Sequence, residues 1–203
     1  MQQLTIFLIL ISANVFSQRH LDFGQIKADS TFSCNDQLNI IYQEGRTYNG
    51  HSTGLKSICQ SGNEFEIRFF VAHRPSIAWD LFVITFNNNI WSATKYSFNW
   101  GRKSFDTAQP ITVSDLRPKY GFDSLFFNLK MNHVFTLPDQ NVLTQDILVH
   151  DGNIYFLTFK ADNNFRRFYF EDPDTYKEHF KNIPEFINFG NIVSFFYKDL
   201  EKE

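Results

Sequence analysis

Several features that would assign a chain to a known class are missing from this sequence of 203 residues. After residue 17, no apolar run approaches the roughly 18 residues that a membrane-spanning helix requires. The 19 basic and 22 acidic side chains leave a net charge of only −3, which gives no electrostatic basis for binding nucleic acid or an anionic lipid surface. No repeat, linker or low-complexity tract divides the chain. We therefore expect residues 18–203 to form a single globular domain.

The histidines and acidic residues also lack the spacing of a metal site. None of the six histidines pairs with another at the i+2 or i+4 spacing that a zinc site on one element would use. Glu171, Asp172 and Asp174 are close in sequence, but they lack the spaced oxygen ligands of a calcium loop. Capping of a helix that begins at Pro173 explains them better. We therefore expect no metal ion and no cofactor.

The most informative segment that is present lies at the start of the chain. Residues 4–11 form an apolar stretch that is too short to span a bilayer, and small residues follow it. Val15 and Ser17 stand three positions and one position before Gln18, which is the pattern of a signal-peptidase cleavage site. We therefore predict that residues 1–17 are a cleaved signal peptide and that the product is periplasmic or extracellular.

The two cysteines, Cys34 and Cys59, both follow the predicted cleavage site. An even number of cysteines in an exported chain is typical of a disulfide framework. No CxxC motif and no neighbouring histidine pair favours a metal ligand set instead, although two free thiols remain an alternative. We therefore predict one disulfide between Cys34 and Cys59, which would stabilise the fold by roughly 3.5 kcal/mol through the loop that it closes.

Phenylalanine is conspicuous, with 25 copies. Aromatic side chains favour strands, so we interpret the excess as a β-rich core rather than as an aromatic binding surface. The cleanest strand is Glu64–Ala72, in which apolar residues alternate with charged residues such as Glu66 and Arg68. Such alternation predicts that one face of the strand packs on the core and that the other is solvated.

Two hairpins are predicted further along the chain. The first runs from Trp79 to Trp100 and turns at Asn87-Asn88-Asn89, because asparagine tolerates left-handed backbone geometry. The second runs from Ile147 to Lys160 and turns at Asp151-Gly152, a dipeptide that is typical of a type I′ turn. The nearly continuous apolar sequence after Trp79 indicates a strand that is buried on both faces.

Helical spacing of apolar residues predicts a helix over Phe122–Leu129. Asp172-Pro173 predicts the start of another helix, and Pro184–Lys198 keeps helical spacing after a further proline. Leu38–Tyr42 is an additional strand candidate, whereas Pro110–Pro118 is expected to be irregular. Together the elements predict an α+β fold, an antiparallel sheet of hairpins with two or three helices packed on one face.

One five-residue motif suggests catalysis. Gly50-His51-Ser52-Thr53-Gly54 matches the G-x-S-x-G nucleophile elbow, in which a sharp strand-to-helix turn exposes the serine. His150 and His179 follow in an order that a catalytic triad allows, with Asp146 or Asp151 as the orienting carboxylate. The flanking sequence predicts neither the buried strand nor the helix that the motif requires. We therefore interpret residues 50–54 as a turn, with Ser52, His150 and Asp146 as the candidates for catalysis if that interpretation fails.

A second motif, Ser92-Ala93-Thr94-Lys95, matches the S-x-x-K of penicillin-recognising enzymes. In those enzymes the two residues share one helical turn, whereas here they lie in a predicted strand, where residues three apart point to opposite faces. We therefore assign this motif no catalytic role. On the same strand we expect Tyr96 and Phe98 to face the core, and Lys95 and Ser97 to face outward.

Two stretches of the C-terminal part resemble a known group of proteins. They are LFFNLKMNHVFTLPDQ (Leu125–Gln140) and DGNIYFLTFKADNNFRRFYFEDPDTY (Asp151–Tyr176). Both are similar to uncharacterised exported proteins of Bacteroidota-type bacteria, in which a helix and an L-P-D-Q-like turn precede a D-G hairpin and a D-P or N-P helix start. The resemblance implies a compact exported domain of a bacterial envelope, and it implies no catalytic or binding residue.

These observations favour a non-enzymatic exported domain that binds a protein or another envelope component, as an accessory or immunity-type protein. The identity of the partner is left open by the sequence. Two alternatives belong to other classes, namely a small exported hydrolase that uses Ser52 and a carrier of a small apolar ligand. The carrier is an alternative because an aromatic-rich sheet could enclose an apolar cavity.

Overall fold

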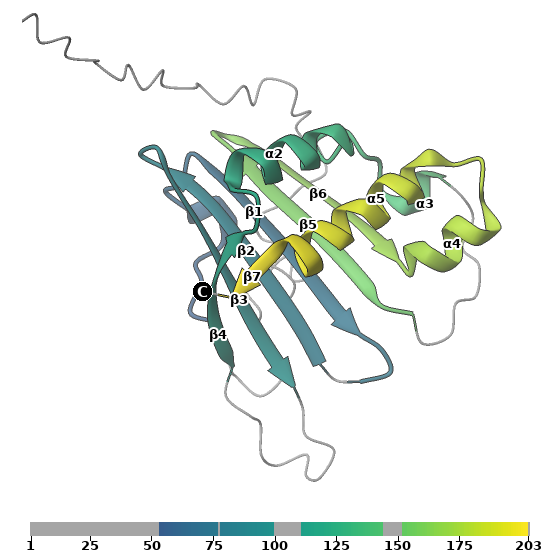
Figure 1. Ribbon diagram of the computed structural model, residues 1–203, viewed down its shortest axis with the longest axis horizontal. Coiled ribbons are helices and arrows are strands. Elements are labelled where there is room, and N and C mark those ends of the chain that lie inside the picture. Colours follow the sequence, from purple (N-terminus) through teal and green to yellow (C-terminus); the bar gives the residue numbers. More distant parts are fainter. Residues whose placement is uncertain (1–52, 77, 100–110, 144–151, 203) are drawn as a thin grey trace, which may run out of the picture.

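Figure 1 shows the computed structural model, which describes residues 53–76, 78–99, 111–143 and 152–202. Seven antiparallel strands form one sheet in the order β6-β5-β1-β2-β3-β4-β7, and helices α2, α4 and α5 pack on one face of it. In chain order the elements are η1 (Ile58–Gln60), β1 (Phe65–His73), β2 (Ala78–Asn87), β3 (Ile90–Asn99), β4 (Thr112–Pro118), α2 (Phe122–Met131), α3 (Gln140–Leu143), β5 (Ile154–Ala161), β6 (Asn164–Glu171), α4 (Pro173–His179), α5 (Pro184–Ser194), η2 (Phe195–Asp199) and β7 (Leu200–Lys202). The fold is α+β, which confirms the prediction from the sequence.

The first core lies between the helices and the side of the sheet that faces them. Alternate residues of each strand point into it, such as Phe65 and Phe69 of β1, because successive side chains of a strand point to opposite faces. Many of its aromatic rings contact one another directly. Phe170 and Phe189 stack with their centroids 4.1 Å apart, and Phe69 and Phe196 stack at 4.4 Å. Much of the phenylalanine in the chain therefore serves ring-on-ring packing in this core.

A second core covers part of the opposite face and corrects the prediction that this face is solvated. Its buried members are Phe70, Trp79, Leu81, Val83 and Phe98. The segment before β1 packs over the same face, where Leu55 contacts the second core and Ile58 is fully buried. Strand β2 is therefore buried on both faces, as its apolar sequence predicts.

The first hairpin turns where the sequence predicts, with Asn88 and Asn89 at φ of 50° and 62°. The position predicted for the second hairpin is wrong. β5 pairs with β6 through a turn at Asp162, whose φ is 51°, and not through Asp151-Gly152, of which Asp151 lies outside the described residues. The two neighbours of β5 in the sheet are β1 and β6.

The segment that was expected to be irregular contains strand β4. It pairs with β3 along Thr112–Leu116, and it pairs with β7 only along Leu116–Pro118. The two prolines that suggested irregular structure stand at its margins. Pro110 precedes the strand in sequence, and Pro118 is its last residue, a position near a sheet edge where a missing N–H group is tolerated.

Helices α2 and α4 begin where the sequence predicts. Asp172 stands at the N-cap of α4 and Pro173 follows it, but Asp172 has a left-handed φ of 34°. Its carboxylate accepts a hydrogen bond from Thr175 Oγ1 at 2.6 Å and caps no backbone N–H group. The last predicted helix is divided into two parts, since α5 ends at Ser194 and the π-helical η2 continues it from Phe195.

The outer edge of β6 is covered in part by the residues that lead into α3. The backbone N–H of Tyr169 donates to Asp139 Oδ2 at 3.2 Å, and the backbone N–H of Glu171 donates to Gln140 Oε1 at 3.0 Å. Side chains thus satisfy backbone groups that no strand pairs with.

Three predictions concern residues outside the described ranges, namely the signal peptide at residues 1–17, the strand Leu38–Tyr42, and Cys34. Cys59 is described and belongs to η1, and its disulfide with Cys34 stays a prediction. Within the described ranges, no helix is long and apolar enough to cross a membrane.

Candidate functional site

Five polar side chains meet on the helix-facing side of the sheet, toward the ends of β2 and β3 that project beyond the helices (Figure 1). We call them the Asp80 cluster, and they are His73 of β1, Asp80 of β2, Lys95 and Ser97 of β3, and Tyr197 of η2. The strand register explains why they meet. Asp80 lies opposite Ser97, and Lys95 shares the face of Ser97 because the two are two residues apart on one strand.

The Asp80 carboxylate is the centre of this cluster, and both of its oxygens accept hydrogen bonds. Ser97 Oγ donates to Oδ1 at 2.6 Å, and the Tyr197 hydroxyl donates to Oδ2 at 3.2 Å. His73 Nε2 lies 3.0 Å from Oδ2, and Lys95 Nζ forms an ion pair with the same oxygen at 3.1 Å. The carboxylate therefore fixes four donor side chains from three different elements.

The same contacts set the charge of the cluster. Burial of the Asp80 carboxylate disfavours its ionised form, but hydrogen bonds from His73 and Ser97 and the charge of Lys95 outweigh this effect and lower the pKa of Asp80 to about 2. Burial of the phenol and the neighbouring Asp80 charge raise the pKa of Tyr197 above its usual value of 10. At neutral pH, Asp80 is therefore ionised and Tyr197 is a protonated donor.

Aromatic rings form the wall of the cluster. Lys95 Nζ lies 5.0 Å from the centroid of the Phe82 ring and 5.6 Å from that of Tyr197, within range of a cation–π interaction. The π-helical turn of η2 brings two consecutive rings to the sheet, since both Phe196 and Tyr197 make edge contacts with Phe82. Helical turns of this kind are rare and frequently lie at functional sites.

The donor groups of the Asp80 cluster are more accessible than its carboxylate. The side chains of His73 and Lys95 are 29% and 27% exposed, whereas that of Asp80 is 12% exposed. Ser114 of β4 lies opposite Lys95 in the strand register, so it is on the same face. Its hydroxyl has no hydrogen-bond partner among the residues that the structure describes. The surface of the cluster is therefore rich in donors above a buried negative charge.

A second charged group, which we call the inner cluster, lies on the opposite face of the sheet. It consists of Glu66, Arg68 and Lys160, which are only 2%, 3% and 8% exposed. Arg68 Nε donates to Glu66 Oε1 at 2.6 Å, and Lys160 Nζ donates to the backbone carbonyls of Ser61 and Asn63. Because its partners belong to the segment before β1, the inner cluster attaches that segment to the sheet.

Comparison with known proteins adds no family to this description. The chain matches no protein-family model, no curated protein and no solved structure. The resemblance of its C-terminal part to exported proteins of Bacteroidota-type bacteria therefore stays a prediction.

The candidates of the first motif, Ser52, His150 and Asp146, all lie outside the described residues, so no triad among them is tested. Two residues of the motif are described. Gly54 has a φ of +74°, a left-handed conformation that suits a turn, and Thr53 Oγ1 accepts a hydrogen bond from the backbone N–H of Leu55 at 3.2 Å.

The second motif lies in strand β3, as the sequence predicts, and its serine and lysine are on opposite faces. Ser92 is 2.7 Å from the hydroxyl of Thr85 on the face opposite the helices, whereas Lys95 belongs to the Asp80 cluster. The expectation that Lys95 and Ser97 face outward is wrong in one respect, because they face the helix side and bind Asp80. Within the described ranges, no group of three His, Cys, Asp or Glu residues could hold a metal ion.

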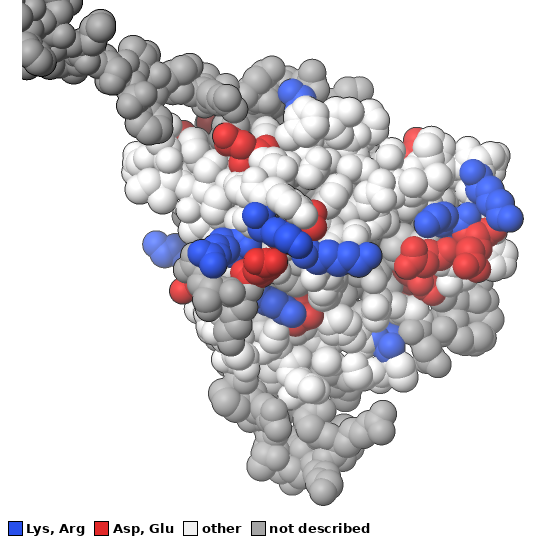
Figure 2. Space-filling view, viewed as in Figure 1, with Lys and Arg blue, Asp and Glu red and all other residues white. Residues whose placement is uncertain are grey.

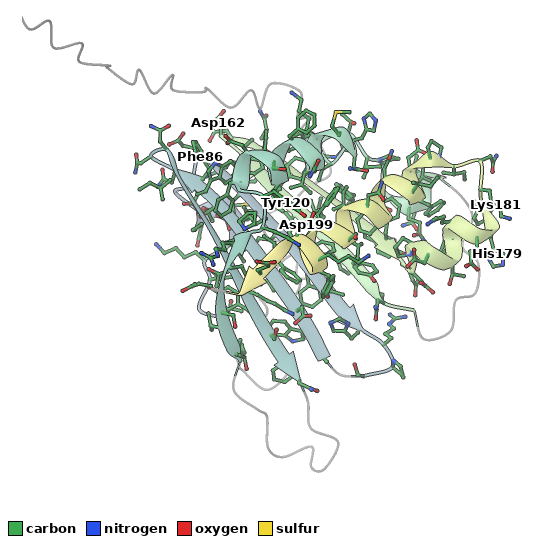
Figure 3. The ribbon with its side chains drawn as sticks, viewed as in Figure 1. Phe86, Tyr120, Asp162, His179, Lys181 and Asp199 are labelled. Atoms are coloured by element: carbon green, nitrogen blue, oxygen red, sulfur yellow. The ribbon has the colours of Figure 1, made fainter. Side chains whose placement is uncertain are left out.

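The remaining described histidines lie away from the Asp80 cluster. His179 is at the far end of the molecule on α4, where its Nδ1 lies 2.9 Å from the carbonyl oxygen of Thr175 (Figure 3). His133 follows α2 in a turn with a left-handed φ of 58°. Of these three histidines, His73 is the one whose side chain contacts a carboxylate, that of Asp80.

Proposed function

We propose that this chain is a non-enzymatic exported domain that binds its ligand or partner at the Asp80 cluster. The observation that carries this proposal is the set of partly exposed donor side chains that one buried carboxylate holds in place. A binding site needs polar groups in fixed positions, and fixing them before binding reduces the entropic cost of association. The exported location and an accessory or immunity-type role are parts of the proposal that depend on the predicted signal peptide.

The low pKa of Asp80 and the contacts of His73 argue against proton-transfer chemistry in the cluster. A carboxyl group with a pKa of about 2 is too weak a base to take a proton at neutral pH. His73 and Asp80 have the contact of a histidine and its orienting carboxylate, but Ser97 directs its hydroxyl to Asp80. Among the described residues, no hydroxyl or thiol contacts the ring nitrogens of His73 as a nucleophile would.

The packing of the first core argues against the carrier alternative. A cavity for an apolar ligand would be lined by aromatic side chains that face an empty space. The described rings instead contact one another, for example Phe170 with Phe189 and Phe69 with Phe196. The space between the sheet and the helices is therefore occupied by the protein's own side chains at these positions.

A thermal-shift screen against a panel of anionic, cationic and neutral polar ligands tests the proposal. Lys95→Met removes an accessible donor of the Asp80 cluster. Lys119→Met is its matched control, because Lys119 also lies over a tyrosine ring, that of Tyr120, with Nζ 5.5 Å from the centroid. Tyr120 lies near Asp199 and not in the cluster (Figure 3). We expect a ligand that stabilises the wild type and Lys119→Met but fails to stabilise Lys95→Met.

Two results would contradict the proposal. One is a ligand response that is unchanged in Lys95→Met, which would place binding elsewhere on the chain. The other is stoichiometric labelling by a fluorophosphonate probe that Ser52→Ala abolishes, because such labelling requires an activated hydroxyl and would make this protein an enzyme.

A further inference from the structure

The charges of the Asp80 cluster are arranged in depth. The carboxylate of Asp80 is the most buried of its ionisable groups, and the ammonium of Lys95 and the imidazole of His73 reach solvent above it. An approaching group therefore meets hydrogen-bond donors first. A cation would meet the charge of Lys95, whereas a group with several acceptor oxygens would meet complementary donors.

Lys95 has donor capacity that the protein does not use. An ammonium carries three N–H groups, and the contact with Asp80 Oδ2 at 3.1 Å is the hydrogen-bonding contact of Lys95 Nζ within the described structure. The rings of Phe82 and Tyr197 restrict the side chain without accepting those N–H groups as an oxygen would. Lys95 is therefore held in position with N–H groups left for a ligand.

Hydroxyl groups extend the same surface toward β4. Ser114 lies opposite Lys95, and Thr112 lies opposite Ser97, so all four residues share one face of the sheet. The side chains of Ser114 and Thr112 have no hydrogen-bond partner among the residues that the structure describes. A bound group that contacts Lys95 can thus accept a second hydrogen bond from the neighbouring strand.

We infer that the Asp80 cluster binds an oxyanion, a carboxylate or a phosphate group of the ligand, with Lys95 as its principal contact and Ser114 as a second donor. The inference rests on the proposed function and names the ligand chemistry of the same site. Asp80 is a positioning residue, because it holds Lys95, His73 and Tyr197 and does not face the ligand.

The test is a ¹H–¹⁵N NMR titration of the purified chain with inorganic phosphate and, separately, with acetate. Sodium chloride at matched ionic strength is the salt control. We expect saturable shifts of the backbone amides of Lys95, Ser97 and Ser114 with at least one oxyanion and not with chloride. A response to phosphate alone or to acetate alone identifies the source of the oxyanion, and a response to both identifies a general oxyanion site.

Variants assign the response to Lys95. Lys95→Met should weaken binding by about tenfold or more, and Lys95→Arg should retain it, because the guanidinium keeps the charge and the donors. Lys119→Met should bind like the wild type. The dispersion of each spectrum shows whether the variant is folded, so a lost response in a folded Lys95→Met protein is interpretable.

Three outcomes would overturn the inference. They are no saturable shift with either oxyanion, an equal response to chloride, and shifts that persist in Lys95→Met. The fate of the proposed function is separate. A neutral or cationic ligand from the screen could bind in a manner that depends on Lys95 while neither phosphate nor acetate binds. That result would support the proposed binding function and contradict the inference that the ligand carries an oxyanion.

Discussion

The Asp80 cluster and the inner cluster lie on opposite faces of the same sheet and differ in what surrounds them. The charges of the inner cluster have partners within the protein, and the segment before β1 covers them. The Asp80 cluster has a carboxylate that is similarly satisfied, but its amine and imidazole reach solvent. Burial, rather than the presence of charge, therefore separates a group that holds the fold together from one that is available to a ligand.

Figure 2 shows the helix-facing side of the molecule, where charged side chains gather in two regions with mainly uncharged atoms between them. One region crosses the middle of this side, and the other lies at the end that α4 occupies. Exposed ion pairs on such a surface contribute little to stability because water and salt screen them. The Asp80 cluster and the inner cluster are therefore better compared by substituting their residues one at a time.

The largest effect is expected in the inner cluster. Glu66→Ala should lower the free energy of unfolding by about 3–5 kcal/mol, because it leaves the buried guanidinium of Arg68 without its carboxylate partner. Urea denaturation followed by circular dichroism measures the change. Glu178→Ala, on the exposed surface of α4, is the control and should stay within about 0.5 kcal/mol. A decrease in the free energy of unfolding of less than about 1 kcal/mol for Glu66→Ala would show that water reaches Arg68 and that the inner cluster is not buried as described.

The next effect concerns the carboxylate of the Asp80 cluster. Because the pKa of Asp80 falls from 3.8 to about 2 on folding, its ionised form stabilises the protein above pH ~4, and this contribution is lost as the pH falls toward 2. Asp80→Asn should therefore cost about 2 kcal/mol at neutral pH and flatten the loss of stability between pH ~5 and ~2.

Urea denaturation at a series of pH values measures both parts of this prediction. Asp162→Asn is the control, because Asp162 is exposed in a turn whose left-handed φ asparagine tolerates. Parallel stability profiles for the wild type and Asp80→Asn would refute the proposed role of the carboxylate as the charged centre of its cluster.

A smaller effect on stability is expected in the segment before β1, which packs over the inner cluster. Gly54→Ala should destabilise the protein by about 1 kcal/mol, because its φ of +74° is a conformation that alanine adopts only with strain. Gly62→Ala is a matched control on the same segment. A Cβ at either position meets nothing within 4 Å, but only Gly54 has a positive φ. Equal melting temperatures for the two variants would show that the left-handed φ of Gly54 does not penalise alanine.

The smallest effect is expected for the exposed cation of the Asp80 cluster. Lys95→Met should change the free energy of unfolding by only about 0.5 kcal/mol, because partly exposed ion pairs contribute little and methionine retains apolar contact with Phe82. Chemical denaturation checks this value. A loss as large as that of Glu66→Ala would assign Lys95 a structural role and erase the difference between the two clusters.

Local patterns in the sequence are sufficient for much of the fold. The apolar run of β2, the asparagines at the first turn and the helical spacing of α2 each depend on residues that are close in sequence, and each prediction is confirmed. The position predicted for the second hairpin was wrong because local sequence alone could not decide it. Two dipeptides, Asp151-Gly152 and Asp162-Asn163, can both supply a turn, and only the pairing of β5 with β1 and β6 selects between them.

The candidate site was not predictable in the same way. Asp80 and Tyr197 are 117 residues apart, and no periodicity links them. One local signal was present, since Asp80 interrupts the buried sequence of β2 and a buried carboxylate needs partners. Glu66 and Arg68 were interpreted as a solvated face because each is charged, although two residues of spacing in a strand lets them form a pair on one face.

The side chains that cover the edge of β6 also bear on how the molecule meets other copies of itself. An exposed strand edge is a template on which a further strand can add, and it is a common start of aggregation. Two amide groups of β6 that would template such growth already donate to Asp139 and Gln140. In this phenylalanine-rich chain, the side chains of Asp139 and Gln140 therefore disfavour pairing of the β6 edge with a strand of another copy.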